Sequence, residues 1–380
     1  MHTINFYPVN NGDSAQIVLE NGKRILLDYR QCSDATDNSV PSFNVAEKLR
    51  EDLENANRDC FDVVAFTHAD KDHIEGCAEF FELRHAEKYQ GEGRIKIDEL
   101  WVPASIVLES ATNDEQSNEF VILRQEARYR LKEGSGIKIF AKPQEIVDWM
   151  ENNDVDVAQR EHLFVDAGTI VSTFSLDNDG IEFFCHSPFM KHIEGGGKEI
   201  RNQSAIIFNI RIKSGAELYD FFAIGDSEWK VLEEIVAITK NKSNNDRLEW
   251  DLFKAAHHCS YLALSDEKGD QETVPKPLIK ELLESGRSDA YIVSSSKAIS
   301  FDNDAYQQTQ PPHVQARNCY QKYLNSVGGR KFLVTMEEPN KTKPEPIVFE
   351  IGNGGMSWKR KVVTGATILT QSTPPRAGKQ

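Results

Sequence analysis

The chain has 380 residues, which is enough for one large α/β domain or two smaller ones. It contains 44 Lys and Arg but 60 Asp and Glu, so its formal net charge is −16. An acidic chain argues against binding of nucleic-acid phosphates, which requires Lys and Arg, although bound metal cations would locally reverse the charge. The sequence has no apolar run of the length, about 18 residues, that spans a membrane, so no membrane association is expected.

The cysteines and the first residues of the chain indicate the cellular compartment of the protein. The six cysteines are scattered and form no CxxC pair. Residues 1–6 lack the basic block and the apolar block of a signal peptide. Together these features predict a cytoplasmic protein with reduced thiols.

Apolar periodicity divides the chain into two strand-rich halves, 1–83 and 165–360. Alternating residues at the start predict strands joined by hairpin turns at 10–13 and 20–23. In chain order, the sequence then predicts a helix at 44–55, a buried strand at 61–66, helices at 74–83, 119–131 and 143–151, strands at 169–176, 181–186, 204–212 and 218–224, a helix at 228–239, a strand at 252–256, a helix at 276–286, a strand at 290–294, a helix at 313–326, and strands at 331–336, 347–351 and 355–361. The polar tail 364–380 is expected to be disordered, which leaves one domain over 1–363.

The strongest indication of function is the run Thr-His-Ala-Asp-Lys-Asp-His-Ile-Glu-Gly at 67–76, between a buried strand and a helix. In an extended loop His68, Asp70 and Asp72 point the same way, because side chains repeat every two residues. His73 turns inward as the helix begins. Burying four such groups together is costly without a cation. Open α/β sheets also place their sites at the carboxyl ends of strands. We therefore interpret the run as a metal-binding loop rather than a solvated polar loop.

Two further ligand groups follow buried strands in the same way. The apolar run 221–224 is followed by Gly-Asp, with the acid at Asp226. The run 252–256 is followed by the pair His257-His258. Taken alone, the acid is explained equally well as a helix N-cap, and the histidine pair as packed core. Because both accompany the first motif, we predict that they are ligands.

The motif His-x-Asp-x-Asp-His resembles the metallo-β-lactamase superfamily motif His-x-His-x-Asp-His. The chain resembles, over most of its length, the hydrolase domain of ComEC-type DNA-uptake proteins and their stand-alone relatives. The other motifs that carry this resemblance are, in the same order, Gly12-Asp13-Ser14, Gly22 with Ile25-Leu26-Leu27-Asp28, Asn202-Gln203-Ser204, Gly225-Asp226, His257-His258-Cys259-Ser260 and Pro312-His313. The resemblance implies an α/β fold, the metallo-β-lactamase αββα sandwich, with two sheets face to face and helices outside.

The chain also departs from the family pattern. Tyr29-Arg30 stand where the family usually has Gly-Gly, and Cys259 replaces a glycine. The spacing between His73 and Asp226 is longer than the family pattern leads us to expect. We therefore expect an inserted helical segment near 86–165 that acts as a lid or as a surface for a protein partner.

The resemblance implies a centre that holds two divalent metal ions. The implied ligands are His68, Asp70, Asp72, His73, Asp226 and His257, with Asp226 bridging the two ions. Asp72 is also the implied catalytic residue, which orients the attacking hydroxide. The sequence does not decide between His257 and His258 as the ligand. It offers no clear match to the usual third ligand of the first metal, and His186, the nearest candidate, fits a structural role better. Asp70 in place of a second histidine moves the metal preference from Zn²⁺ toward Mn²⁺ without excluding zinc.

Four residues are candidates for substrate binding, with a structural role as an equal alternative for each: Asn202, Ser204, His258 and His313. The resemblance implies phosphodiester hydrolysis in DNA or RNA, which makes nucleic acid the expected partner. The acidic charge favours instead a small nucleotide, an ester or a lactone as substrate. A metal-stabilised regulatory binding module is the non-enzymatic alternative, and the intact set of metal ligands argues against it.

Overall fold

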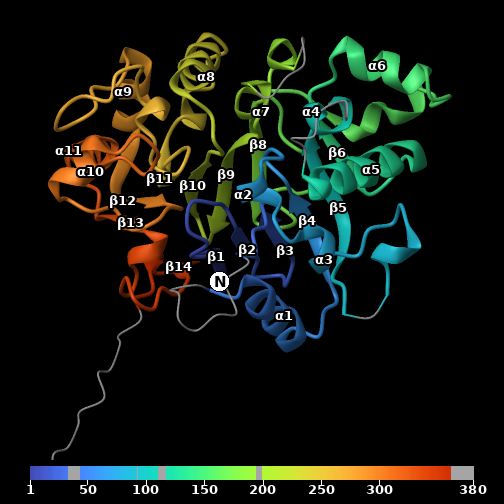
Figure 1. Ribbon diagram of the computed structural model, residues 1–380, viewed down its shortest axis with the longest axis horizontal. Coiled ribbons are helices and arrows are strands. Elements are labelled where there is room, and N and C mark those ends of the chain that lie inside the picture. The colour runs from blue at the N-terminus through green and yellow to red at the C-terminus, as the bar shows by residue number, and fades with distance from the viewer. Residues whose placement is uncertain (33–42, 92, 110–116, 194–198, 361–380) are drawn as a thin grey trace, which may run out of the picture.

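Two β-sheets lie face to face, with helices on both outer sides, in the computed structural model (Figure 1). It describes residues 1–32, 43–91, 93–109, 117–193 and 199–360. Within these residues, one sheet has nine strands and the other has six. The predicted αββα sandwich is confirmed.

The nine-stranded sheet mixes antiparallel pairs at one edge with parallel pairs at the other. Its strands are, in spatial order, β15 (Gly355–Trp358), β14 (Ile347–Gly352), β1 (His2–Phe6), β2 (Ala15–Val18), β3 (Arg24–Leu27), β4 (Cys60–Ala65), β5 (Lys96–Pro103), β6 (Ile137–Phe140) and β7 (Phe164–Val165). The pairs from β15 to β3 are antiparallel, and those from β3 to β7 are parallel.

In the second sheet, parallel pairs cover most of the width, and the antiparallel pairs lie at one edge. Its strands are, in spatial order, β13 (Lys331–Val334), β12 (Gly286–Ser294), β11 (Trp250–Lys254), β10 (Glu217–Ala223), β9 (Ile207–Ser214) and β8 (Ile181–Ser187). The pairs from β13 to β10 are parallel, and β9 and β8 continue antiparallel.

Helices cover the outer face of each sheet (Figure 1). The first sheet is covered by α1 (Val45–Asn55), α3 (Cys77–Phe80), α4 (Ala104–Leu108), α5 (Asn118–Glu133) and α6 (Gln144–Glu151). The second is covered by α8 (Trp229–Asn241), α9 (Pro277–Glu284), α10 (Asn303–Gln307) and α11 (Val314–Ser326). The short helices are α2 (Lys71–Ile74) and α7 (Glu199–Gln203), and the 3₁₀ turns are η1 (Glu87–Tyr89), η2 (Ala158–Leu163), η3 (Met190–His192), η4 (Asn245–Arg247), η5 (Tyr261–Ala263) and η6 (Thr335–Glu337).

The alternation of side chains along the strands separates three apolar cores. In β3, Ile25 and Leu27 face the second sheet, while Leu26 faces the helices. Between the sheets, the Trp101 ring meets the Phe183 ring edge-on, with centroids 5.1 Å apart. Both faces of each sheet are therefore buried, which explains why the central strands read as nearly continuous apolar runs.

The segment 86–165, expected as a helical insertion, also contributes the strands β5, β6 and β7 to the first sheet. The apolar run Leu-Trp-Val at 100–102 is buried on both faces, so it shows no alternation from which a strand could be predicted. The expected strand 169–176 forms only the isolated bridge between Ile170 and Phe184. Its second half turns instead, with the Asp179 carboxylate accepting from the Ser175 amide. The predicted tail 364–380 lies outside the described residues.

Among the helices of the described residues, we find none with the length and apolar character needed to cross a membrane.

We predict that Phe183→Ala lowers the free energy of unfolding by about 3–5 kcal/mol, because it opens a cavity in the core between the sheets. Phe183 is fully buried, with its ring near those of Trp101, Phe174 and Phe208. The matched control, Ile170→Ala, removes a side chain that is 46% exposed and should change stability by less than about 0.5 kcal/mol. Urea denaturation followed by circular dichroism measures both. Equal effects of the two changes would contradict the assignment of Phe183 to the central core.

Candidate metal centre

The predicted ligands follow strands from both sheets. β4 leads into the loop 67–76, β10 leads to Asp226, and β11 leads to the pair His257-His258. β4 pairs in parallel with β3, and β10 pairs in parallel with β11, so each sheet presents carboxyl ends side by side. Loops at such ends are the usual place for a site in α/β proteins.

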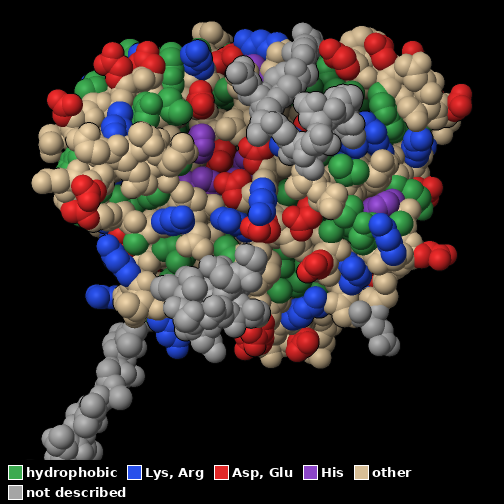
Figure 2. Space-filling model, in the orientation of Figure 1, with side chains coloured by type: hydrophobic (Ala, Val, Ile, Leu, Met, Phe, Trp, Pro, Cys, Tyr) green, Lys and Arg blue, Asp and Glu red, His purple; other side chains and the backbone are tan. Residues whose placement is uncertain are grey.

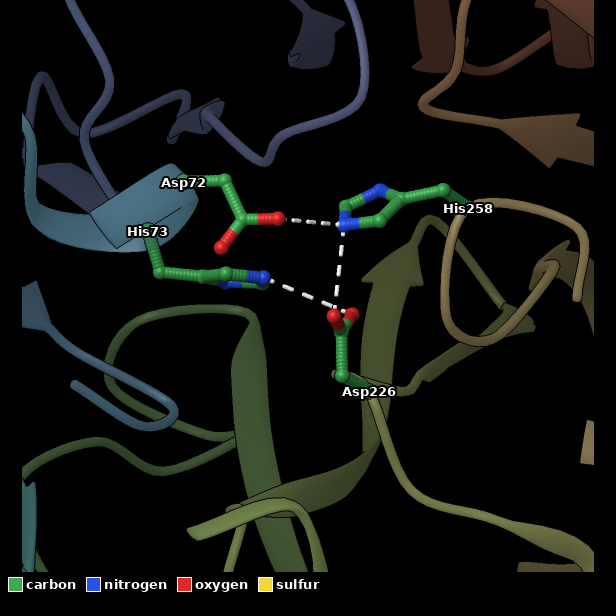
Figure 3. A group of neighbouring side chains, drawn as sticks. All are labelled: Asp72, His73, Asp226 and His258. Carbon is green, nitrogen blue, oxygen red and sulfur yellow. Dashed lines mark hydrogen bonds and ion pairs between the residues drawn. The ribbon is translucent and has the colours of Figure 1, made fainter. Parts of the chain in front are cut away.

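Asp72, His73, Asp226 and His258 form a tight group of possible metal ligands. One nitrogen or oxygen of each lies within 4.8 Å of those of the other three. Their side chains point toward one another (Figure 3). His258 Nε2 lies 3.0 Å from Asp72 Oδ2 and 3.2 Å from Asp226 Oδ2. His73 Nε2 lies 3.4 Å from Asp226 Oδ1. Two imidazoles and two carboxylates thus meet in one small volume.

Two further carboxylates hold His73 in place. Asp28 Oδ2 lies 2.8 Å from His73 Nδ1, and Asp28 also accepts from the amide and the hydroxyl of Thr67, both at 2.7 Å. A carboxylate on Nδ1 fixes the ring so that Nε2 faces the centre. Asp13 Oδ2 lies 3.6 Å from His73 Nε2 and accepts from Lys254 Nζ at 2.6 Å. Asp13, Asp28 and His73 make a second group of possible ligands within the same 4.8 Å limit.

Several buried atoms at the centre have no hydrogen-bond partner among the described residues. They include Nε2 of His68, Oδ1 of Asp13, and Nε2 of His73 with Oδ1 of Asp226, which lie 3.4 Å from each other as an ion pair but do not form a hydrogen bond. His68 Nε2 lies 3.9 Å from Asp226 Oδ2, and the His68 and His73 rings are 3.8 Å apart between centroids. Unpaired buried polar atoms are unfavourable. Imidazole nitrogens suit Zn²⁺, and carboxylate oxygens suit Mn²⁺. The donor set therefore fits a divalent cation.

The two adjacent histidines take different places. His258, expected to bind substrate, enters the tight group, and its Nδ1 lies 2.8 Å from the Ser295 carbonyl. His257, expected as the ligand, has its Nε2 3.9 Å from Asp226 Oδ2 and is 21% exposed. The φ angles of His257, His258 and Cys259 are 49°, 52° and 65°. Three left-handed residues in succession turn the chain sharply at a conformational cost, and they explain why glycine would suit position 259.

Asp70 is not a member of the tight group, although the resemblance implied that it binds the first metal with His68. Its Oδ1 accepts from Arg201 Nη1 at 2.9 Å, and Arg201 also pairs with Glu109. Neither of the two groups of possible ligands found in the described residues contains Asp70, His68 or His257.

Opposite charges hold the centre ionised. Burial raises the pKa of the Asp226 and Asp72 carboxyls, but His258 and His73 outweigh it, so both pKa values lie below the usual range. Burial lowers the pKa of His258, but Asp226 and Asp72 raise it to about 10. Asp28 and Asp226 likewise raise the pKa of His73 against burial. Burial and the neighbouring His73 lower the pKa of His68, which favours the neutral ring that binds metal.

The remaining substrate-binding candidates have mixed surroundings. Ser204 is buried, and its hydroxyl donates to Ser105 Oγ at 2.9 Å. Asn202 keeps a buried Oδ1 without a hydrogen-bond partner. His313 precedes α11 with its Nδ1 3.4 Å from the Tyr261 amide and with Nε2 buried and unpartnered, and burial lowers its pKa to about 4.

His186 lies outside the centre. Its Nε2 is 2.9 Å from the Arg247 carbonyl and its Nδ1 is 3.3 Å from Thr239 Oγ1. With a partner on each ring nitrogen, it has the structural role that the sequence favoured.

Four residues of the centre were not predicted as site residues: Asp13, Asp28, Lys254 and Arg201. Asp28 follows the buried strand β3 as Asp226 follows β10, so the same pattern of strand and acid would have identified it. Lys254 is a buried lysine at the end of β11, which is unusual enough to indicate a buried acid as its partner. Arg201 has no comparable pattern around it.

The chain matches no protein-family model and no curated protein. Solved structures similar to it include the following two, both with a low TM-score and low sequence identity. One is a diphosphatase from the PhnP family, with a TM-score of 0.31 and 11% identity over 77% of this chain and 86% of that one. The other is a quorum-quenching N-acyl homoserine lactone lactonase, with a TM-score of 0.29 and 11% identity over 64% of this chain and 88% of that one. The description of this chain as an αββα sandwich with a candidate metal centre rests on its own strand order and side chains.

We predict that Mn²⁺ or Zn²⁺ stabilises the protein through this centre. At a free metal concentration of about 100 times Kd, binding adds about 2.7 kcal/mol to the free energy of unfolding. Asp226→Asn should largely remove the metal-induced rise in Tm, because Asp226 contacts both His73 and His258. Asp289→Asn, a change at an exposed acid paired with Arg330, should leave it intact. Thermal melting with and without chelator measures the rise, and equal shifts in the two variants would contradict a centre at Asp226.

Proposed function

We propose that this chain is a metal-dependent hydrolase. The observation that carries the proposal is the set of buried atoms without a hydrogen bond on His68, His73 and Asp226, beside His258, which contacts both Asp72 and Asp226. A structural metal site is closed by its protein ligands, whereas a catalytic metal site keeps one position open to solvent. Asp72, at 31% exposure of its side chain, supplies that access.

The residues divide into positioning and reacting groups. A bound divalent cation would activate water and stabilise the negative charge that develops on the substrate. His73, His258, Asp72 and Asp226 would hold the cation. Asp28 and the Ser295 carbonyl orient the two imidazoles through their Nδ1 atoms. The solvent access of Asp72 supports its role as the group that orients the attacking water.

For the substrate, we propose a phosphodiester of DNA or RNA. The order of the ComEC-like motifs supports this class, and a cation centre suits phosphoryl oxygens. Figure 2 shows histidine and acidic side chains near the middle of one face, with Lys and Arg side chains beside them. Cationic side chains are therefore present beside the acidic ones on this face, despite the acidic chain. The net charge of −16 favours the second candidate, a small nucleotide.

We predict chelator-sensitive hydrolysis of bis-p-nitrophenyl phosphate and of labelled DNA or RNA, with Mn²⁺ more effective than Mg²⁺. The imidazole nitrogens of the centre bind Mn²⁺ more tightly than Mg²⁺. A homoserine lactone is assayed in parallel. Cleavage of the small diester without cleavage of either polymer would favour the small-nucleotide candidate. Turnover of the lactone alone would contradict a phosphodiesterase, and turnover unaffected by chelator would contradict a metal-dependent hydrolase.

We predict that Asp72→Asn lowers kcat at least about 100-fold on any substrate that the wild type hydrolyses. Loss of a charged ligand removes several kcal/mol of transition-state stabilisation. The amide is close in shape to the acid, so the fold should persist, as circular dichroism checks. The matched control is Asp289→Asn, which should keep wild-type kcat. A fully folded Asp72→Asn enzyme with wild-type kcat would show that Asp72 has no role in turnover.

A further inference from the structure

Arg201 lies beside the metal centre, and each nitrogen of its guanidinium pairs with a carboxylate. Nη1 donates to Asp70 Oδ1 at 2.9 Å, Nε donates to Glu109 Oε2 at 3.0 Å, and Nη2 pairs with Glu109 Oε1. The carbon of the guanidinium also lies 4.9 Å from the centroid of the Phe120 ring. The two-point pairing with Glu109 and the contact with the ring fix the group in position.

This arrangement removes Asp70 from the set of available ligands. Asp70 follows His68 by two positions in the same loop, which is why the sequence predicted that the two bind one ion together. In the structure, one oxygen of Asp70 already neutralises a guanidinium, which stays protonated at any working pH. His68 is left with an unpartnered Nε2 that lies 3.9 Å from Asp226 Oδ2.

Displacing Arg201 is more costly than breaking one surface ion pair. If Asp70 rotated toward a cation, Glu109 and Phe120 would still hold the guanidinium beside it. The fixed positive charge would then oppose the incoming cation at close range. The group made by Asp72, His73, Asp226 and His258 includes no arginine, so it lacks this competitor.

We propose that Arg201 limits the centre to one tightly bound divalent ion, by holding Asp70 away from a second position beside His68. The inference rests on the proposed metal centre. It makes Arg201 a positioning residue that acts through Asp70, and it revises the expectation of two ions. Removing the guanidinium should release Asp70 and allow a second ion to bind.

The test measures metal content rather than activity. Purified protein is loaded with Mn²⁺, freed of excess metal by gel filtration, and analysed for metal content and by electron paramagnetic resonance. We expect one ion for the wild type, with the hyperfine pattern of an isolated Mn²⁺. For Arg201→Met we expect a second ion, bound about 10–100-fold more tightly than to the wild type, and the spectral signature of two coupled ions.

Three further variants separate this role from a general loss of structure. The double variant Arg201→Met with Asp70→Asn should return to one ion, because the released ligand is gone. Glu109→Gln should keep one ion, because Arg201 still holds Asp70. If the network were merely structural, Glu109→Gln and Arg201→Met would change the metal content in the same way. Arg330→Met removes an exposed arginine paired with Asp289 and serves as the matched control, with wild-type metal content. Arg201→Gln replaces Arg201→Met if that variant does not fold.

The outcomes distinguish the two proposals. Two tightly bound ions in the wild type, or one ion in a folded Arg201 variant, would overturn the role of Arg201 and leave the metal centre standing. A wild type that binds no Mn²⁺ or Zn²⁺ would overturn the metal centre itself, and this inference with it.

Discussion

The structure depends on compensating the charge of acids buried between the two sheets. Asp13, Asp28 and Asp226 are each at most 4% exposed. An unpaired carboxylate at such depth is strongly unfavourable. Each acid has a specific partner: Lys254 for Asp13, the donors of Thr67 for Asp28, and two imidazoles for Asp226. In the absence of metal, protons on the imidazoles balance the acids, and a divalent cation would release those protons on binding.

This balance requires elements that are distant in sequence to meet. Asp13 lies between β1 and β2, whereas its partner Lys254 ends β11 of the other sheet. The ion pair therefore links the two sheets at the point where the centre forms. The left-handed turn at 257–259 serves the same geometry, since it directs His258 into the group and leaves the His257 side chain partly exposed. Strain of this kind persists only where surrounding contacts impose it.

Much of this could be predicted from the sequence, and the failures have physical causes. His68, Asp72, His73 and Asp226 were recognisable because each follows a buried apolar run, and the structure brings them together. The choice between His257 and His258 was not predictable, because it depends on the left-handed backbone turn at 257–259, and two adjacent histidines give no local signal for which side chain the turn directs inward. The pairing of Asp70 with Arg201 joins residues 131 positions apart, and no local pattern encodes it. Strands β5 to β7 were missed because their apolar runs are short, and a short apolar run does not distinguish a buried strand from a buried helix.

The depth of the centre determines which charges a substrate would meet. Asp226 and His258 are almost fully buried, whereas the side chains of Asp70 and Asp72 are each 31% exposed. An approaching anion would therefore encounter the side of the centre that carries Asp70 and its partner Arg201.

Charges farther than about 10 Å are largely screened at 0.1 M salt. The net charge of −16 is spread over the whole chain, so most of it is screened from a substrate at the centre. Binding at the centre depends instead on the cation, because Asp70 and Glu109 already pair with the guanidinium beside it. For this reason an acidic chain and an anionic substrate are compatible.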